Sequence, residues 1–107
     1  MHKDLGELAA ALQLFEKALE ISETSNGLEH PDTSTALFNV AGLLWTRGQL
    51  LQEQGQSTVA QPLFERARSL FERGLTIREK RFGTDHPDTV AMRNYLQELA
   101  GYGLPCN

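Results

Sequence analysis

A block of twenty residues occurs twice in this chain, 56 positions apart. Residues 14–33 read LFEKALEISETSNGLEHPDT and residues 70–89 read LFERGLTIREKRFGTDHPDT, with eleven identical positions. A block that recurs at a fixed period is typical of proteins built from stacked structural repeats. Such proteins generally present a binding surface to a partner and carry out no chemistry. The recurrence therefore predicts a repeat architecture and favours a binding role over catalysis.

The length and charge of the chain narrow the class of protein. A chain of 107 residues allows one domain, expected over residues 1–103 with a tail at 104–107. The net charge of −4 argues against a nucleic-acid partner, which a basic surface would bind. Charged residues interrupt every apolar run, so no membrane partner is expected. Cys106 is the single cysteine and cannot form an internal disulfide, which fits a reducing, cytoplasmic setting.

The spacing of apolar residues predicts four helices and no strand. Apolar side chains recur at intervals of three and four residues, which is the pattern of an amphipathic helix. The segment HPDT opens the second and fourth helices, because proline is tolerated at the first helical position. Short connections imply antiparallel neighbours, so the predicted fold class is all-α. The predicted helices cover about residues 4–25, 31–55, 57–82 and 87–102.

Several segments resemble, in order, the tetratricopeptide repeat family, in its kinesin light chain-like type with a repeat of about 42 residues. They are HPDT at 30–33, ALFNVA at 36–41, Gln54-Gly55, and AQPLFERA at 60–67. The resemblance implies an antiparallel helix-hairpin stack, a fragment of a right-handed α-solenoid, with helices in the order B–A–B–A. It also implies a non-enzymatic protein–protein interaction or scaffolding module with a protein or peptide partner and no cofactor. The chain could equally be a fragment of a longer array.

The period of 56 exceeds that of the family by 14 residues, and two duplications account for the surplus. LLWTRGQ at 43–49 is followed by LLQEQGQ, and LFERARS at 63–69 by LFERGLT, with four identities in each case. Seven residues make nearly two helical turns, so the apolar stripe keeps its face. Equal insertions in both arms should lengthen the central hairpin by about 10 Å. A hairpin turn at 47–50 is rejected because its arms would be unequal.

One candidate binding surface follows from the resemblance. In the family, one face of each A helix lines a concave groove that accepts extended peptides. By position, the groove residues here would be Phe38, Asn39, Trp45, Asn94, Tyr95 and Glu98. The alternative for Trp45 is a buried position against the third helix or another chain, since large aromatic side chains more often pack than recognise a ligand.

The second candidate surface is the lengthened hairpin itself. Its apolar stripe exceeds what the shorter neighbouring helices could cover, and an uncovered stripe usually marks an interface. The stripe comprises Leu43, Leu44, Leu50 and Leu51. We therefore expect a homo-oligomer, with a closed two-fold dimer preferred over an open head-to-tail stack of the fourth helix on the first.

Residues that could carry chemistry do not cluster in the sequence. His30 and His86 each lie beside carboxylates, and both residue types can bind zinc. Nothing supplies a closed set of three or four ligands, so both histidines are interpreted as parts of a recurring helix start. The glutamates fall on polar helix faces, where solvated charges are normal. The sequence therefore predicts no catalytic residue, no metal site and no cofactor.

Overall fold

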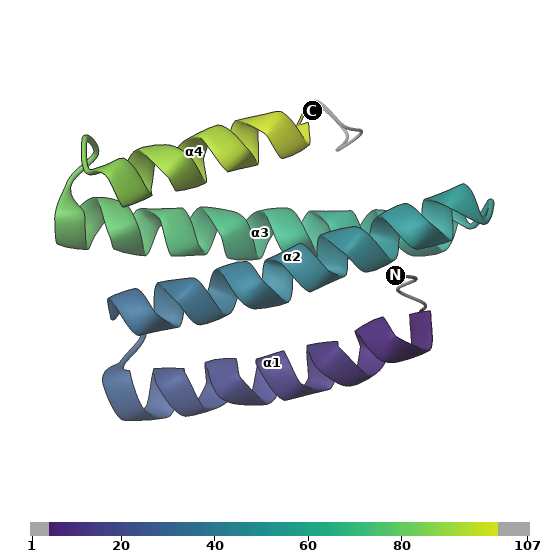
Figure 1. Cartoon of the computed structure of the whole chain (residues 1–107), viewed down its shortest axis with the longest axis horizontal. Helices are drawn as coiled ribbons and strands as arrows, with labels where there is room; N and C mark the ends of the chain where they lie inside the picture. The colour runs from purple at the N-terminus through teal and green to yellow at the C-terminus, as the bar shows by residue number, and fades with distance from the viewer. Residues whose placement is uncertain (1–4, 101–107) are drawn as a thin grey trace.

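The chain folds into four helices, each antiparallel to the one before it (Figure 1). The computed structural model describes residues 5–100, and no strand occurs within that range. This confirms the all-α helix-hairpin stack. The predicted tail at 104–107, and the outermost residues of the first and last predicted helices, lie outside the described range. The helices are α1 (Leu5–Asn26), α2 (Pro31–Glu53), α3 (Ser57–Phe82) and α4 (Pro87–Ala100).

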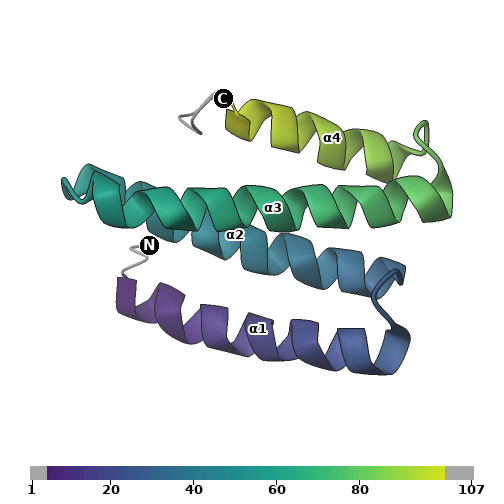
Figure 2. The same ribbon diagram turned by 180° about the vertical axis from the view of Figure 1, so that it is seen from behind.

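The turn of the central hairpin lies where the two duplications place it. α2 passes through Gly48 without a break and ends at Glu53. Gly55 then adopts a φ of +81°, a left-handed conformation that side chains rarely take. The hairpin formed by α2 and α3 extends past the described ends of α1 and α4 (Figures 1 and 2). The alternative turn at 47–50 is excluded, because those residues are helical.

Two glycines let aromatic rings of the opposite helix lie against the backbone. A Cβ atom added to Gly74 of α3 would lie 2.7 Å from the ring of Phe38 on α2. A Cβ atom added to Gly48 of α2 would likewise lie 2.7 Å from the ring of Phe64 on α3. Real Cβ atoms do not approach so closely, so both positions need the absence of a side chain. The two contacts fix the register of α2 on α3.

Two further pairs of facing residues, each at its own level along the hairpin, lie between these two glycine contacts. The same antiparallel register places Ala41 opposite Phe71 and Trp45 opposite Ala67, and all four side chains are buried in the core. Each level therefore pairs one aromatic ring with one small residue, and the ring changes helix at every level. Alternating large and small residues in this way fills the space between two helices without voids.

α1 packs on α2, and the backbones of α1 and α3 stay apart. No Cα atoms of α1 and α3 lie within 8 Å of each other in the described part of the chain. Two ion pairs join α1 to α3, and a third joins the α1–α2 connection to α3; their positions on α3 are seven residues apart. The pairs are Glu16–Arg66, Glu23–Arg73 and Glu29–Lys80.

The leucine stripe of the hairpin is largely covered. Leu44 and Leu51 are buried in the core, and Leu43 and Leu50 are half-buried. Leu44 and Leu51 therefore do not belong to the part of the stripe expected to lack neighbours within one chain, and self-association through Leu43 and Leu50 stays a prediction. The physical reason is that Leu44 and Leu51 belong to the core cluster, which the two arms of the hairpin form together with Leu12 of α1.

Candidate functional site

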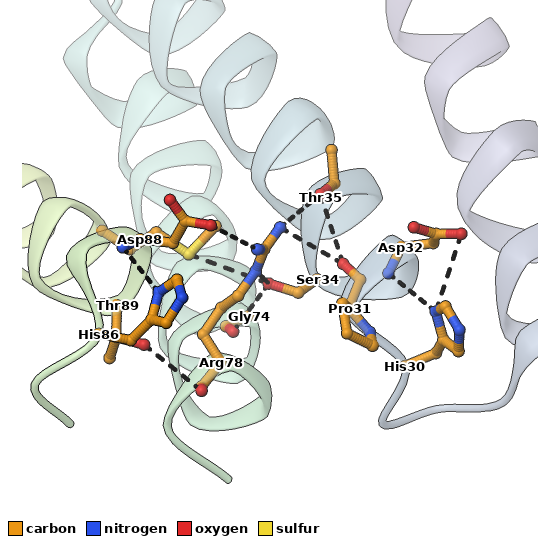
Figure 3. A network of polar contacts seen from close by, with 11 residues as sticks. His30, Pro31, Asp32, Ser34, Thr35, Gly74, Arg78, His86, Asp88 and Thr89 are labelled. Atoms are coloured by element: carbon orange, nitrogen blue, oxygen red, sulfur yellow. Dashed lines mark hydrogen bonds and ion pairs between the residues drawn. The ribbon is translucent and has the colours of Figure 1, made fainter. Parts of the chain in front are cut away.

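Both HPDT segments form the same helix start. The Nδ1 atom of His30 accepts a hydrogen bond from the backbone N–H of Asp32 at 3.0 Å. The Nδ1 atom of His86 accepts one from the backbone N–H of Asp88 at 3.1 Å (Figure 3). Each imidazole thus satisfies an N–H group that the first turn of a helix leaves unpaired. Among residues 5–100, no group of three histidine, cysteine or acidic residues could hold a metal ion.

The threonine of each segment fixes the helix start to the helix before it. Thr33 and Thr89 are completely buried. Thr33 donates a hydrogen bond to the carbonyl oxygen of Gly27 at 2.7 Å, and Thr89 donates to that of Arg78 at 3.4 Å. Thr33 also shares a hydrogen bond of 3.0 Å with the hydroxyl of Ser22, the position equivalent to Arg78, so the A helices α2 and α4 are each anchored to the equivalent position of the preceding helix.

Arg78 connects the N-termini of α2 and α4 across α3 (Figure 3). Its Nε atom donates to the Ser34 hydroxyl at 3.0 Å, and its Nη2 atom donates to the Thr35 hydroxyl at 2.6 Å. Its Nη1 atom lies 3.6 Å from the carboxylate of Asp88, and the side chain is only 12% exposed. Ser34 in turn donates to the carbonyl oxygen of Gly74 at 3.0 Å. This network sets the spacing of the two A helices.

An open depression of about 370 Å³ lies between α2 and α4, beside this network. Its lining combines the apolar Phe38 and Met92 with the polar Asn39, Arg78 and Asp88. The remaining lining residues are Thr35 and Ala91. Its polar side chains include hydrogen-bond donors and acceptors.

Comparison with known proteins decides the family. Sequence models described as tetratricopeptide repeat match residues 1–52 and residues 59–88, which together make up most of the chain. The chain belongs to the tetratricopeptide repeat family. No curated protein and no solved structure matches it. Tetratricopeptide repeats generally mediate protein–protein interaction or scaffolding. Within residues 5–100, no helix is both long and apolar enough to cross a membrane.

Two of the predicted groove residues line the depression, and two others are exposed on α4 without lining it. Phe38 and Asn39 line the depression, and Asn94 is exposed on α4. Tyr95 is also exposed on α4, and its ring is nearly perpendicular to that of Phe71, at 5.4 Å between centroids. The side chain of Glu98 lies outside the described part of the chain.

Trp45 does not line the groove. It is only 3% exposed, and its ring lies 4.7 Å from the ring of Phe64, centroid to centroid. The buried alternative is therefore confirmed for this residue. The reason is the register of the hairpin, which places Trp45 on the side of α2 that α3 covers.

Arg78 is the residue of this site that sequence reasoning missed. It occupies the position at which the first copy of the block has Ser22, 56 residues earlier. The sequence did carry one signal for this role. A small hydroxyl side chain, Ser22, is replaced by a long cationic one, Arg78, within a block that has eleven identities. Its meaning depended on knowing that α3 has an A helix on either side, whereas α1 has a described neighbour on one side only.

Proposed function

We propose that this tetratricopeptide chain is a non-enzymatic protein-interaction module that holds an extended peptide along the α2–α4 face. The observation that carries the proposal is the depression between the two A helices, which both helices line. The family generally mediates protein–protein interaction, which supports the class of function. The exposed asparagines, Asn39 on α2 and Asn94 on α4, support the mode of binding.

The chemistry of the face favours a particular kind of peptide. A carboxamide both donates and accepts hydrogen bonds, so Asn39 and Asn94 can pair with the backbone amides of an extended chain. Phe38 and Met92 favour an apolar side chain between those two points. Arg78 and Asp88 neutralise each other, so the face favours no net charge on the peptide. We infer an extended peptide with one apolar anchor residue.

Self-association through the hairpin is the weaker candidate. Leu44 and Leu51 are buried within one chain, which leaves the half-buried Leu43 and Leu50 to form the contact. A dimer through these two residues would have few apolar side chains at its centre, whereas stable interfaces have a well-packed apolar core. The peptide face therefore takes precedence in this proposal.

A peptide library tests the proposal. Random twelve-residue peptides displayed on phage are selected on the immobilised chain, and the affinities of the selected peptides are measured by calorimetry. Asn39→Ala and Asn94→Ala should each weaken binding about tenfold, the effect of losing one hydrogen bond. Gln13→Ala, on the exposed surface of α1, is the control and should change nothing. Selection of no binding peptide, or equal affinities for all three variants, would contradict the proposal.

A further inference from the structure

α1 has apolar residues on two sides, and only one side is covered. Leu8 and Leu12 are buried in the chain. Leu14, Phe15 and Ile21 are 72%, 38% and 55% exposed. In Figures 1 and 2, α1 forms an outer edge of the stack, and no other described helix lies beyond it. An uncovered apolar surface of this kind marks a contact with another molecule.

The second copy of the block shows how such a face is covered. The equivalents of Phe15 and Ile21, 56 residues later, are Phe71 and Ile77, which are only 1% and 3% exposed. The equivalent of Ala18 is Gly74, which lies against the ring of Phe38 on α2. Around Phe71 and Gly74, the same face is therefore closed on α3 by the antiparallel helix α2, whereas Ile77 lies beside Leu28 and Glu29 of the α1–α2 connection.

The outer face of α1 can pair with a second copy of itself so that each ring meets a small residue. Along the face, Ala11, Phe15, Ala18 and Ser22 follow one another at steps of four, three and four residues. These steps are the same when they are read in reverse. When two such helices are laid antiparallel, Phe15 of each comes level with Ala18 of the other, and Ala11 comes level with Ser22. Every ring then faces a small residue, as it does between α2 and α3.

We propose that α1 pairs with α1 of a second copy of this chain, antiparallel about a two-fold axis that passes between positions 15 and 18. The Phe15 ring of each copy lies on Ala18 of the other, as the Phe38 ring lies on Gly74 within one chain. Leu14 and Ile21 lie on one flank of the face. Across the contact, the two-fold axis brings Leu14 of one copy beside Ile21 of the other copy. A closed, isologous dimer results.

The charges on α1 are compatible with this contact. Glu16 and Glu23 are directed toward α3, where they pair with Arg66 and Arg73. At about 100° per residue, Lys17 lies about 100° or more around α1 from the centre of the proposed contact face, and therefore outside that face. No charged side chain therefore has to be buried at the centre of the pair.

α4 of a second copy is a poorer occupant of the same face. In the repeat, the equivalents of Phe38 and Ala41 are Asn94 and Gln97, both exposed. A head-to-tail stack would set these two amides against Ala18 and Phe15. The amides would lose water without gaining a hydrogen-bond partner from the apolar face, which costs free energy. The open head-to-tail assembly is therefore disfavoured relative to the α1 pair.

Sedimentation equilibrium of the full chain, from low to high micromolar concentration, tests the proposal. The parent should behave as a monomer–dimer equilibrium. Ala18→Glu should weaken the dimer at least about 100-fold, because it buries a charge at the centre of the contact. Val59→Glu, which adds the same charge at an exposed position of α3, should leave the equilibrium unchanged. A parent that is monomeric throughout, or a dimer that only Val59→Glu dissociates, would overturn the proposal.

Exchanging the large and the small residue tests the register. Phe15→Ala alone should weaken the dimer, because two small residues then face each other. The double variant Phe15→Ala/Ala18→Phe should restore the parent's dissociation constant to within about tenfold, since the two-fold axis again sets a ring opposite a small residue. A double variant no tighter than Phe15→Ala alone would overturn the pairing of positions 15 and 18.

Discussion

The two copies of the repeated block, on α1 and on α3, present the same apolar face in two environments. On α3 the face around Phe71 is closed by α2, Ile77 lies beside Leu28 and Glu29 of the α1–α2 connection, and both Phe71 and Ile77 are buried. On α1 the equivalent residues, Phe15 and Ile21, are partly or largely exposed. Because the residues are the same, the difference comes from the neighbouring helix. The repeated sequence therefore specifies an apolar face that a neighbouring helix can cover. Which helix covers that face depends on the surroundings of each copy.

The largest difference is expected for the two equivalent phenylalanines. Phe71→Ala should lower the free energy of unfolding by about 3–5 kcal/mol, since it leaves a cavity in the core. Phe15→Ala should cost about 1–2 kcal/mol when measured on the dilute monomer, because part of that ring already contacts water. Urea unfolding followed by circular dichroism measures both. Equal losses would mean that the two faces are equally covered in one chain.

The next largest loss of stability is expected at Arg78, where the first block has Ser22. Arg78→Met should cost about 1.5–3 kcal/mol, because Ser34, Thr35 and Asp88 lose a charged partner that is mostly shielded from water. Arg68→Met is the control: it removes an exposed pair with Glu72, for which the expected loss is below about 0.5 kcal/mol. Unfolding free energies that agree for the two variants would contradict the role given to Arg78.

A smaller change in the free energy of unfolding is expected at Gly74 and at the equivalent Ala18. Replacing a helical glycine by alanine usually stabilises a helix, and here we expect the opposite. Gly74→Ala should destabilise the chain by about 1 kcal/mol. The added Cβ atom would meet the Phe38 ring at 2.7 Å, which outweighs the better helix propensity of alanine. Ala18→Gly should also destabilise, by about 0.5–1 kcal/mol, because no ring occupies the space and only propensity is lost. A stabilising Gly74→Ala would show that the ring of Phe38 moves freely.

The smallest effect is expected from the charged bridge that joins the two blocks. A double-mutant cycle on Glu23 and Arg73 should give a coupling energy below about 1 kcal/mol, since both side chains are partly exposed. The coupling should shrink further in 1 M salt, where the screening length is about 3 Å. A coupling that is large and independent of salt would mean that α1 and α3 are closer packed than their backbones indicate.

The sequence was sufficient for the features that depend on local structure. The period of apolar residues predicted four helices, and glycines such as Gly27 and Gly55 located their ends, because propensity and turn geometry act over a few residues. The resemblance to the tetratricopeptide family also placed Asn39 and Asn94 on exposed surface. These predictions needed no knowledge of how one helix lies on another.

The features that failed depend on the register between helices. Trp45 and Leu44 were candidates for exposed surface, yet both are buried. The pairing of rings with small residues turns Trp45 toward α3, and Leu44 belongs to a core cluster that also includes Leu12 of α1. Arg78 was missed because its partners, Ser34 and Asp88, lie on two other helices. Contacts of this kind arise only when the helices have been laid together, so the spacing along one helix does not reveal them.

Labelling of a single thiol compares the two faces most directly. In a Cys106→Ser background, Ile21→Cys and Ile77→Cys place a thiol at equivalent positions of the two blocks. In dilute solution, the thiol at position 21 should react nearly as fast as in the unfolded chain. The thiol at position 77 should react at least about 1000-fold more slowly, because it is reached only by unfolding. Equal rates at the two positions would contradict the account that one face is open and its copy closed.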